Sequence, residues 1–167
     1  MDKPWGAPIV SFEYFNELRP TLGKVVVISG GFDPIHPGHI SYMIEAKKLG
    51  DTLAVIVNGD AFLTTKKGKP FQPLENRCQI VSAIRNVDYV LPFEIKNDQT
   101  VIKALELIKP DIFAKAGDRY NAETIPEWDN CRQLGIKIIT NVGEEKKWSS
   151  SQFLNDWSQF KNTSSFQ

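Results

Sequence analysis

The chain has little of several features that would mark particular protein classes. Only two of its 167 residues are cysteines, Cys78 and Cys131, and their spacing matches no metal-ligand motif. We therefore expect a reduced, intracellular protein and not a disulfide scaffold. No apolar run approaches the ~20 residues needed to cross a bilayer, and residues 1–6 lack the apolar core of a signal peptide. These absences predict a cytoplasmic protein with no membrane partner.

The chain also lacks net charge, because 20 basic and 20 acidic residues cancel. Without an overall positive field, we expect no nucleic-acid partner, and an anionic small molecule would need locally placed charge. The length fits one domain. We divide the chain into an N-terminal helical extension (1–23), a main domain (24–160) and a flexible, polar tail (161–167).

Short apolar runs alternate with amphipathic segments along the main domain. Runs rich in Val and Ile predict strands at 25–29, 53–57, 88–91, 111–114 and 137–140. Helical periodicity predicts helices at 11–18, 37–48, 73–85, 125–134 and 149–160, and another, carrying Val101 to Ile108, that begins at an Asp98 cap. This alternation predicts a single-domain α/β fold, with a Rossmann-like parallel sheet of about five strands and helices on both faces.

Both histidines of the chain, His36 and His39, lie in the segment Gly30-Gly31-Phe32-Asp33-Pro34-Ile35-His36-Pro37-Gly38-His39, directly after an apolar run. A strand that opens through a glycine loop into a helix start is a phosphate-binding arrangement. Two imidazoles placed there would add donors for the same phosphate, which points to nucleotidyl transfer. A zinc pair would need further ligands that the sequence does not offer nearby, and a purely structural pair that lines the loop is the other alternative.

This segment resembles the signature of the cytidylyltransferase-like nucleotidyltransferases. That superfamily includes glycerol-3-phosphate cytidylyltransferase, phosphopantetheine adenylyltransferase, archaeal FAD synthetase and the heptose-1-phosphate adenylyltransferase domain. The resemblance runs from about Lys24 to Leu154 and includes Val57-Asn58-Gly59-Asp60, Lys66…Lys69-Pro70 and Pro73-Leu74-Glu75-Asn76-Arg77. Two further segments, 108–112 and 115–120, are most similar to the heptose-phosphate branch.

The resemblance implies a set of site residues. His36, His39 and Lys66 would be catalytic. Nucleotide binding would fall to Gly30, Gly31, Phe32, Gly38, Gly117, Asp118, Ser149, Ser150 and Ser151. Substrate binding would fall to Asp33, Asn58, Lys69 and Arg77. Asp33 would hold a metal-bound water or a substrate hydroxyl, and a surface salt bridge would explain Arg77 almost as well.

Two of these segments carry expectations of their own. Lys66-Lys67-Gly68-Lys69 lacks apolar periodicity, which predicts a basic loop that is mobile when empty and gates the α-phosphate; a solvated turn is the alternative. Trp148-Ser149-Ser150-Ser151 resembles the family segment that binds the β- and γ-phosphates. Trp148 replaces a smaller apolar residue there, and lysines replace the upstream arginine of the cytidylyl enzymes, which weakens the cytidylyl interpretation; a plain serine cap is the alternative.

The leading interpretation is an enzyme that joins a nucleoside triphosphate to a phosphorylated small molecule and releases pyrophosphate. ATP is favoured over CTP, a sugar 1-phosphate is the preferred acceptor, and Mg²⁺ is the implied cofactor. A glycerol-3-phosphate-type cytidylyltransferase is the nearest enzyme alternative. A non-catalytic nucleotide-binding module is a different class, and an RNA-binding synthetase-like partner is disfavoured by the neutral charge. A homodimer is compatible with the sequence.

Overall fold

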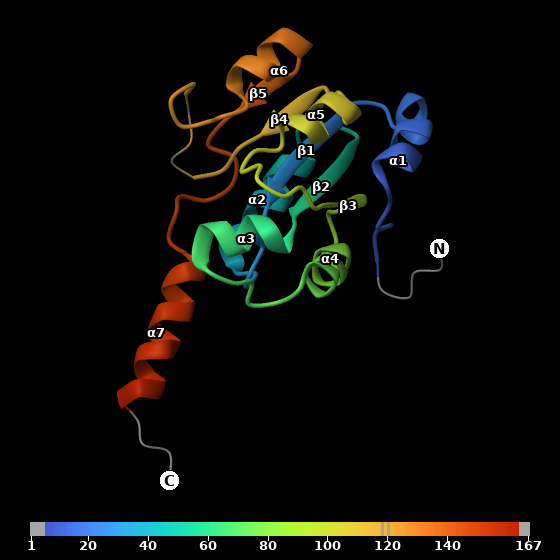
Figure 1. The fold of residues 1–167 in the computed structure, drawn as a ribbon. Coiled ribbons are helices and arrows are strands. Elements are labelled where there is room, and N and C mark those ends of the chain that lie inside the picture. Colours follow the sequence, from blue (N-terminus) through green and yellow to red (C-terminus); the bar gives the residue numbers. More distant parts are fainter. Residues whose placement is uncertain (1–5, 118, 120, 164–167) are drawn as a thin grey trace.

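A five-stranded parallel sheet forms the centre of the protein (Figure 1). The computed structural model describes residues 6–117, 119 and 121–163. The strands are β1 (Val25–Gly30), β2 (Thr52–Asn58), β3 (Tyr89–Phe93), β4 (Ile112–Ala114) and β5 (Lys137–Ile139), in the order β3-β2-β1-β4-β5. The predicted α/β class and Rossmann-like sheet are confirmed, because each apolar run forms a strand within two residues of its expected bounds.

Helices cover both faces of the sheet and bury two separate layers of apolar side chains. One layer includes Met43 and Val81, from α2 (Pro37–Lys47) and α4 (Leu74–Ser82). The other includes Phe15, Leu105 and Cys131, from α1 (Phe12–Leu18), α5 (Ile102–Ile108) and α6 (Trp128–Leu134). The central strands β1 and β2 alternate between the two layers, which explains why they read as continuous apolar runs.

Three local predictions are wrong or displaced. Residues 60–67, for which no helix was predicted, form α3 (Asp60–Lys67). Asp98 does not cap α5: its carboxylate accepts hydrogen bonds from Thr100, and the N–H of Val101 donates to Glu127 instead. The last helix, α7 (Ser150–Thr163), continues three residues into the segment expected to be a flexible tail.

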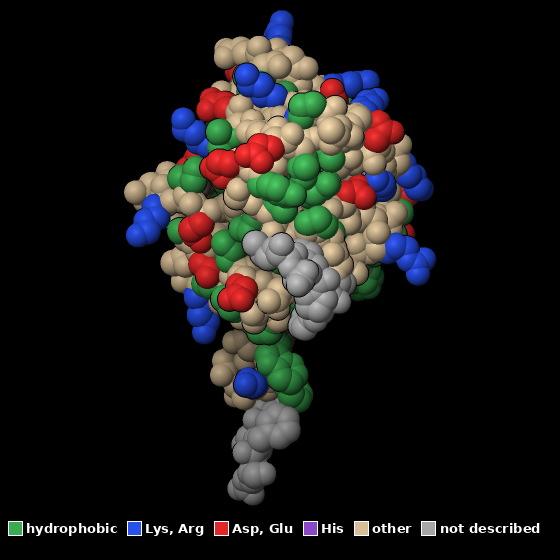
Figure 2. Space-filling view, turned by 90° about the vertical axis from the view of Figure 1, so that its right-hand side faces the viewer, with side chains coloured by type: hydrophobic (Ala, Val, Ile, Leu, Met, Phe, Trp, Pro, Cys, Tyr) green, Lys and Arg blue, Asp and Glu red, His purple; other side chains and the backbone are tan. Residues whose placement is uncertain are grey.

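The N-terminal segment and α7 differ in how they meet the sheet. Residues before α1 pair with the sheet edge, since Val10 N–H donates to the Val90 carbonyl and Val90 N–H donates to Pro8. The helix α7 instead projects away from the body of the molecule (Figure 1). On the face shown in Figure 2, basic and acidic side chains are scattered without a large group of one sign, as the zero net charge leads one to expect.

Candidate active site

The loop after β1 brings the predicted phosphate-binding residues to the carboxyl edge of the sheet. Phe32 adopts a left-handed backbone conformation with φ of 52° and is buried, a conformation that concentrates at functional sites in non-glycine residues. Its ring meets that of His39 edge to face at 5.1 Å. Gly38 is needed for close packing, because a Cβ there would lie 3.0 Å from His36 and 3.2 Å from Trp148.

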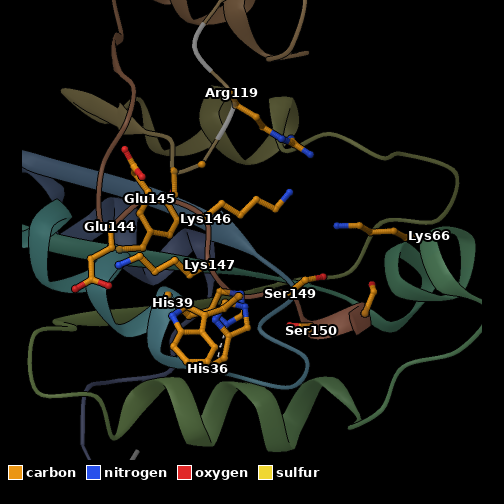
Figure 3. Close-up of a pocket in the computed structure, with 16 residues that line it drawn as sticks. His36, His39, Lys66, Arg119, Glu144, Glu145, Lys146, Lys147, Ser149 and Ser150 are labelled. Atoms are coloured by element: carbon orange, nitrogen blue, oxygen red, sulfur yellow. Dashed lines mark hydrogen bonds between the residues drawn. The ribbon is translucent and has the colours of Figure 1, made fainter. Parts of the chain in front are cut away.

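The two imidazoles lie at the start of α2 and stack on each other, with ring centroids 3.7 Å apart (Figure 3). The N–H of His36 donates to Nδ1 of His39 at 3.3 Å. This bond assigns the proton of a neutral His39 to Nε2, which makes Nε2 a donor. Burial lowers the pKa of His39 to about 3, helped by the positive charges of His36, Lys66 and Lys67. Burial also lowers the pKa of His36, so both rings are neutral donors near pH 7.

The lowered pKa of His39 predicts a specific pH dependence of stability. In the unfolded chain, His39 has its ordinary pKa of 6.5 and is protonated below that pH. In the folded protein, its pKa of about 3 keeps it unprotonated until the pH falls to about 3. Because the unfolded chain binds this proton and the folded protein does not, the free energy of unfolding falls as the pH falls from 6.5 toward 3. Above pH 6.5, His39 causes no such loss. Urea unfolding at pH 7, 6, 5 and 4 should show a steeper loss for the wild type than for His39→Asn. Parallel curves would mean that the folded protein does not exclude this proton.

Lys66 lies in the last turn of α3, and not in the loop that the sequence predicted. The expected mobile segment begins only at Gly68, which ends the helix with φ of 93°. Lys66 is exposed at the rim of the site. Partial desolvation lowers its pKa, and so do the charges of Arg119, Lys67 and Lys146. Anionic phosphate placed among these cations would relieve their repulsion.

Two residues predicted to bind substrate are buried in the scaffold. Asp33 is 2% exposed, and its carboxylate accepts from the N–H groups of Phe71 and Gln72 and pairs with Lys67 at 3.1 Å. Its oxygens are used by the protein, so the predicted contact with substrate or metal-bound water is not available in this arrangement. It instead fixes the backbone that follows α3.

Arg77 is fully buried and also serves the scaffold. Its guanidinium donates to the carbonyls of Gln72, Gly31 and Asn58 at 2.9, 2.9 and 2.6 Å, and pairs with Asp60 at 2.7 Å. These partners come from the loop after β1, the end of β2, the start of α3 and the loop between α3 and α4. The predicted role in substrate binding does not fit, because no donor of Arg77 faces a cavity; the residue holds the edge of the site together. The alternative, a salt bridge, is present as the pair with Asp60, but the guanidinium end of that pair is buried and does not lie at the surface.

The serines begin α7 and connect it to the histidine loop. Ser150 Oγ donates to the Pro34 carbonyl at 2.7 Å, and Ser149 Oγ accepts from the Gln152 N–H at 3.3 Å. Trp148 stacks on Phe153 with centroids 6.0 Å apart. The start of α7 therefore lies beside the imidazoles (Figure 3), with the helix N-terminus positive toward the same space.

These elements enclose a cavity of about 290 Å³. Among the predicted residues, it is lined by His36, Gly38, His39, Lys66, Gly117, Ser149, Ser150 and Ser151. Several lining residues were not among the predicted site residues, including Tyr42, Arg119, Lys146 and Lys147. Figure 3 shows the side-chain ends of Lys66, Lys146 and Arg119 directed toward the same space. The predicted residue Asp118 lies outside the described residues.

A second cavity, of about 220 Å³, adjoins the first. Among the predicted residues, Gly30, Gly31, Phe32, Asn58, His39 and Lys66 line it, whereas Lys69 lines neither cavity. The two cavities share His39, Tyr42, Lys66, Ala116 and Arg119. His39 and Lys66 therefore stand where two ligands would meet. Lys115 and Glu127, both buried, also line the second cavity and were not predicted.

Within the described part of the chain, no three His, Cys, Asp or Glu side chains come together as a metal site. Glu144 and Glu145 line the first cavity together with four cationic residues, Lys66, Arg119, Lys146 and Lys147. The residues present do not fit a protein-held Mg²⁺, and we assign no metal ligand. Among the same described residues, none of the helices has both the length and the apolar character of a membrane span.

Neutral imidazole donors, a helix N-terminus and clustered cations at the carboxyl edge of a parallel sheet are features typical of phosphate-binding α/β domains. Residues 27–155 match the family model described as cytidylyltransferase-like. The chain belongs to this family and is a nucleotidyltransferase by family, as the histidine segment predicts.

The chain is also similar to individual proteins of known name. Bifunctional protein HldE of Hahella chejuensis is 42% identical over 125 residues, which are 74% of this chain and 25% of that protein. Bifunctional protein HldE of Nitrosococcus oceani is 40% identical over 129 residues, 75% of this chain and 26% of that protein. The chain thus spans about a quarter of the length of these relatives.

Solved structures share the fold. The lipopolysaccharide core biosynthesis protein of Thermoplasma volcanium has a TM-score of 0.62 at 27% identity, covering 73% of this chain and 98% of that one. The pantoate-beta-alanine ligase of Francisella tularensis has a TM-score of 0.64 at 18% identity, covering 96% of this chain and 74% of that one. The second similarity bears on the fold alone.

Proposed function

We propose that this chain transfers a nucleotidyl group from a nucleoside triphosphate to a phosphorylated small molecule and releases pyrophosphate. The observation that carries the proposal is the meeting of two cavities at His39 and Lys66, where the neutral ring of His39 lines both cavities and stacks on His36. Such an arrangement suits a reaction in which two phosphate-bearing ligands exchange a group without a covalent enzyme intermediate.

The nucleotide is assigned to the first cavity. Its triphosphate would lie against the N-terminus of α7 and the cations Lys66, Arg119 and Lys146, all of which line that cavity. Gly117, with φ of 73°, lines the same cavity and leaves room for the nucleoside. The acceptor is assigned to the second cavity, with its phosphate toward His39.

The reaction would be a direct displacement. An oxygen of the acceptor phosphate forms a bond to the α-phosphorus. The bond between the α-phosphorus and the oxygen that bridges the α- and β-phosphates breaks. Pyrophosphate leaves with the electron pair. His39 Nε2–H donates to a non-bridging α-phosphate oxygen, His36 supports it, and Lys66 neutralises charge that grows during transfer. Mg²⁺, when bound, would offset the charge of the triphosphate; no residue of this chain is assigned to hold it.

ATP is proposed ahead of CTP, and a sugar 1-phosphate, such as a heptose 1-phosphate, is proposed as the acceptor. Support comes from the similarity to the HldE proteins over the domain and from lysines in place of the arginine found before the serines of cytidylyl enzymes. We also propose that the protein acts in the cytoplasm, because the reaction consumes a nucleoside triphosphate. A homodimer is proposed as well.

A pyrophosphate-release screen tests the function. Purified protein would be incubated with Mg²⁺, ATP or CTP, and each of a panel of sugar 1-phosphates or glycerol 3-phosphate. We expect release with ATP and one sugar 1-phosphate, and a nucleoside-diphosphate sugar detected by mass spectrometry. Release only with CTP and glycerol 3-phosphate would favour the cytidylyl alternative. Nucleotide binding without release for any pair would favour a non-catalytic module.

Replacing Lys66 by alanine should slow chemistry more than it weakens triphosphate binding, because the lysine acts on charge that develops in the transition state. We expect a loss of about 10²-fold in the single-turnover rate, with the Kd for ATP raised only a few-fold. Rapid quench and calorimetry measure the two quantities. Lys69→Ala is the matched control, since Lys69 lies outside both cavities. An unchanged single-turnover rate would make Lys66 a solvated surface charge.

A further inference from the structure

The second cavity contains a buried carboxylate that the proposed reaction does not use. Glu127 is 4% exposed and lines the cavity just before α6. Its Oε1 accepts from the N–H of Val101 at 3.1 Å, which supports the start of α5. Its Oε2 is buried and has no hydrogen-bond partner among the described residues.

A carboxylate oxygen in this position is costly to the protein alone. A buried charged acceptor without a hydrogen-bond partner destabilises the fold, and buried polar groups without partners are rare in folded proteins. Holding α5 requires only one of the two oxygens. The other oxygen is thus available to a group that enters the cavity.

The remaining lining limits what that group is. Lys115 is 6% exposed, lies at the end of β4 and lines the same cavity. Burial lowers the pKa of Lys115, and the negative charge of Glu127 opposes that shift. The amide of Asn58 belongs to the same lining. A cation would be repelled by Lys115, Lys66 and Arg119, and a second anion would be repelled by Glu127.

A hydroxyl is the group that satisfies both neighbours. A carboxylate only accepts and an ammonium only donates, whereas a hydroxyl donates one hydrogen bond and accepts others. A chain or ring of neighbouring hydroxyls, attached to a phosphate held near His39, would meet Glu127, Lys115 and Asn58 together.

We propose that Glu127, with Lys115, is the specificity-determining residue of the acceptor subsite and selects phosphate monoesters that carry several hydroxyls, as sugar phosphates do. This inference rests on the proposed function for the placement of the acceptor. It assigns Glu127 Oε2 as acceptor for a substrate hydroxyl and Lys115 Nζ as donor to a substrate oxygen.

Ligand binding without nucleotide tests the proposal separately from catalysis. The probes are mannose 1-phosphate and methyl phosphate, which share the phosphate monoester but differ in hydroxyls. We expect calorimetry to show that the wild type binds mannose 1-phosphate at least tenfold more tightly than methyl phosphate. Glu127→Gln keeps the Oε1 acceptor for Val101 but replaces Oε2 with a donor, so it should lose most of this preference and leave methyl phosphate binding within twofold.

Asp129→Asn is the matched control, because it removes a carboxylate charge two residues away at an exposed position outside the cavity. It should retain the wild-type preference. Lys115→Met, which keeps the aliphatic stem, should also reduce the preference and serves if Glu127→Gln does not fold.

Equal binding of the two probes by the wild type would overturn the proposal, and so would an unchanged preference in Glu127→Gln and Lys115→Met. A purely structural role of Glu127 predicts a lower Tm with the preference intact. Loss of pyrophosphate release with every acceptor would instead contradict the proposed function, and the binding ratios would still decide the role of Glu127.

Discussion

Replacing His39 by alanine is expected to lower kcat by a factor of about 10²–10³, the usual loss when one preorganised donor to a developing oxyanion is removed. The structure gives the reason. His39 lines both cavities, and its Nδ1 accepts from the His36 N–H, so Nε2–H is directed by the backbone of the same loop. Its pKa of about 3 keeps the ring neutral, and it therefore needs no deprotonation to donate at pH 7.

The Kd for ATP should change only a few-fold, because the cations and the N-terminus of α7 still face the triphosphate. Steady-state pyrophosphate release and calorimetry measure the two effects. His39→Gln, which retains a side-chain donor, should recover part of kcat, whereas a purely structural role would make both variants equally active. Turnover of His39→Ala close to that of the wild type would exclude His39 from the chemistry.

Much of the fold could be read from the sequence because strands buried on both faces are simple apolar runs. In the apolar runs Val25–Ile28 of β1 and Leu53–Val57 of β2, every side chain is buried in one layer or the other, so composition alone marks these strands. The histidine segment is local, and its residues stay together in the structure for the same reason. The residues of this segment are close in the sequence and therefore also close in the structure.

The errors arise where distant residues decide the structure. The helix α3 is short, with Leu63 as its buried residue, and its first N–H groups, those of Asp60 and Ala61, donate to Glu94, which lies beyond β3. Asp33 looked like a site residue because it lies in the signature, yet Lys67 and the backbone after α3 take up its oxygens. The sequence motif shows that Asp33 is charged, but it does not show that Lys67 and the backbone after α3 are its partners in the fold.

Glu127 illustrates the opposite error. It lies far along the chain from the histidines, in a segment with no recognisable motif, and the loop before α6 brings it to the second cavity. No periodicity in the sequence distinguishes it from the exposed acidic residues around it. Lys115 directly follows the strand predicted at 111–114, so its expected position at the carboxyl edge of the sheet could have identified it.

Arg77→Ala should destabilise the protein by about 3 kcal/mol or more, because three carbonyls lose a buried donor and each unsatisfied group costs ~1–3 kcal/mol. The side chain also leaves a cavity in a fully buried position. The salt bridge to Asp60 adds little to this figure, since that carboxylate is 40% exposed and partly screened. Urea unfolding measures the loss, and Arg85→Ala, at an exposed position near the end of the same segment, should stay within about 0.5 kcal/mol of the wild type.

The same variant decides between the two roles considered for Arg77. Its guanidinium connects the carbonyls of Gly31 and Asn58, which belong to residues on the wall of the second cavity. Loss of this connection should lower stability and loosen the site together, so kcat and acceptor KM would both worsen in the fraction that stays folded. A variant with wild-type stability and only a raised acceptor KM would mean that Arg77 binds substrate directly. The complete burial of the guanidinium predicts the first result, because four protein oxygens already accept from it and none of its atoms is exposed to a ligand.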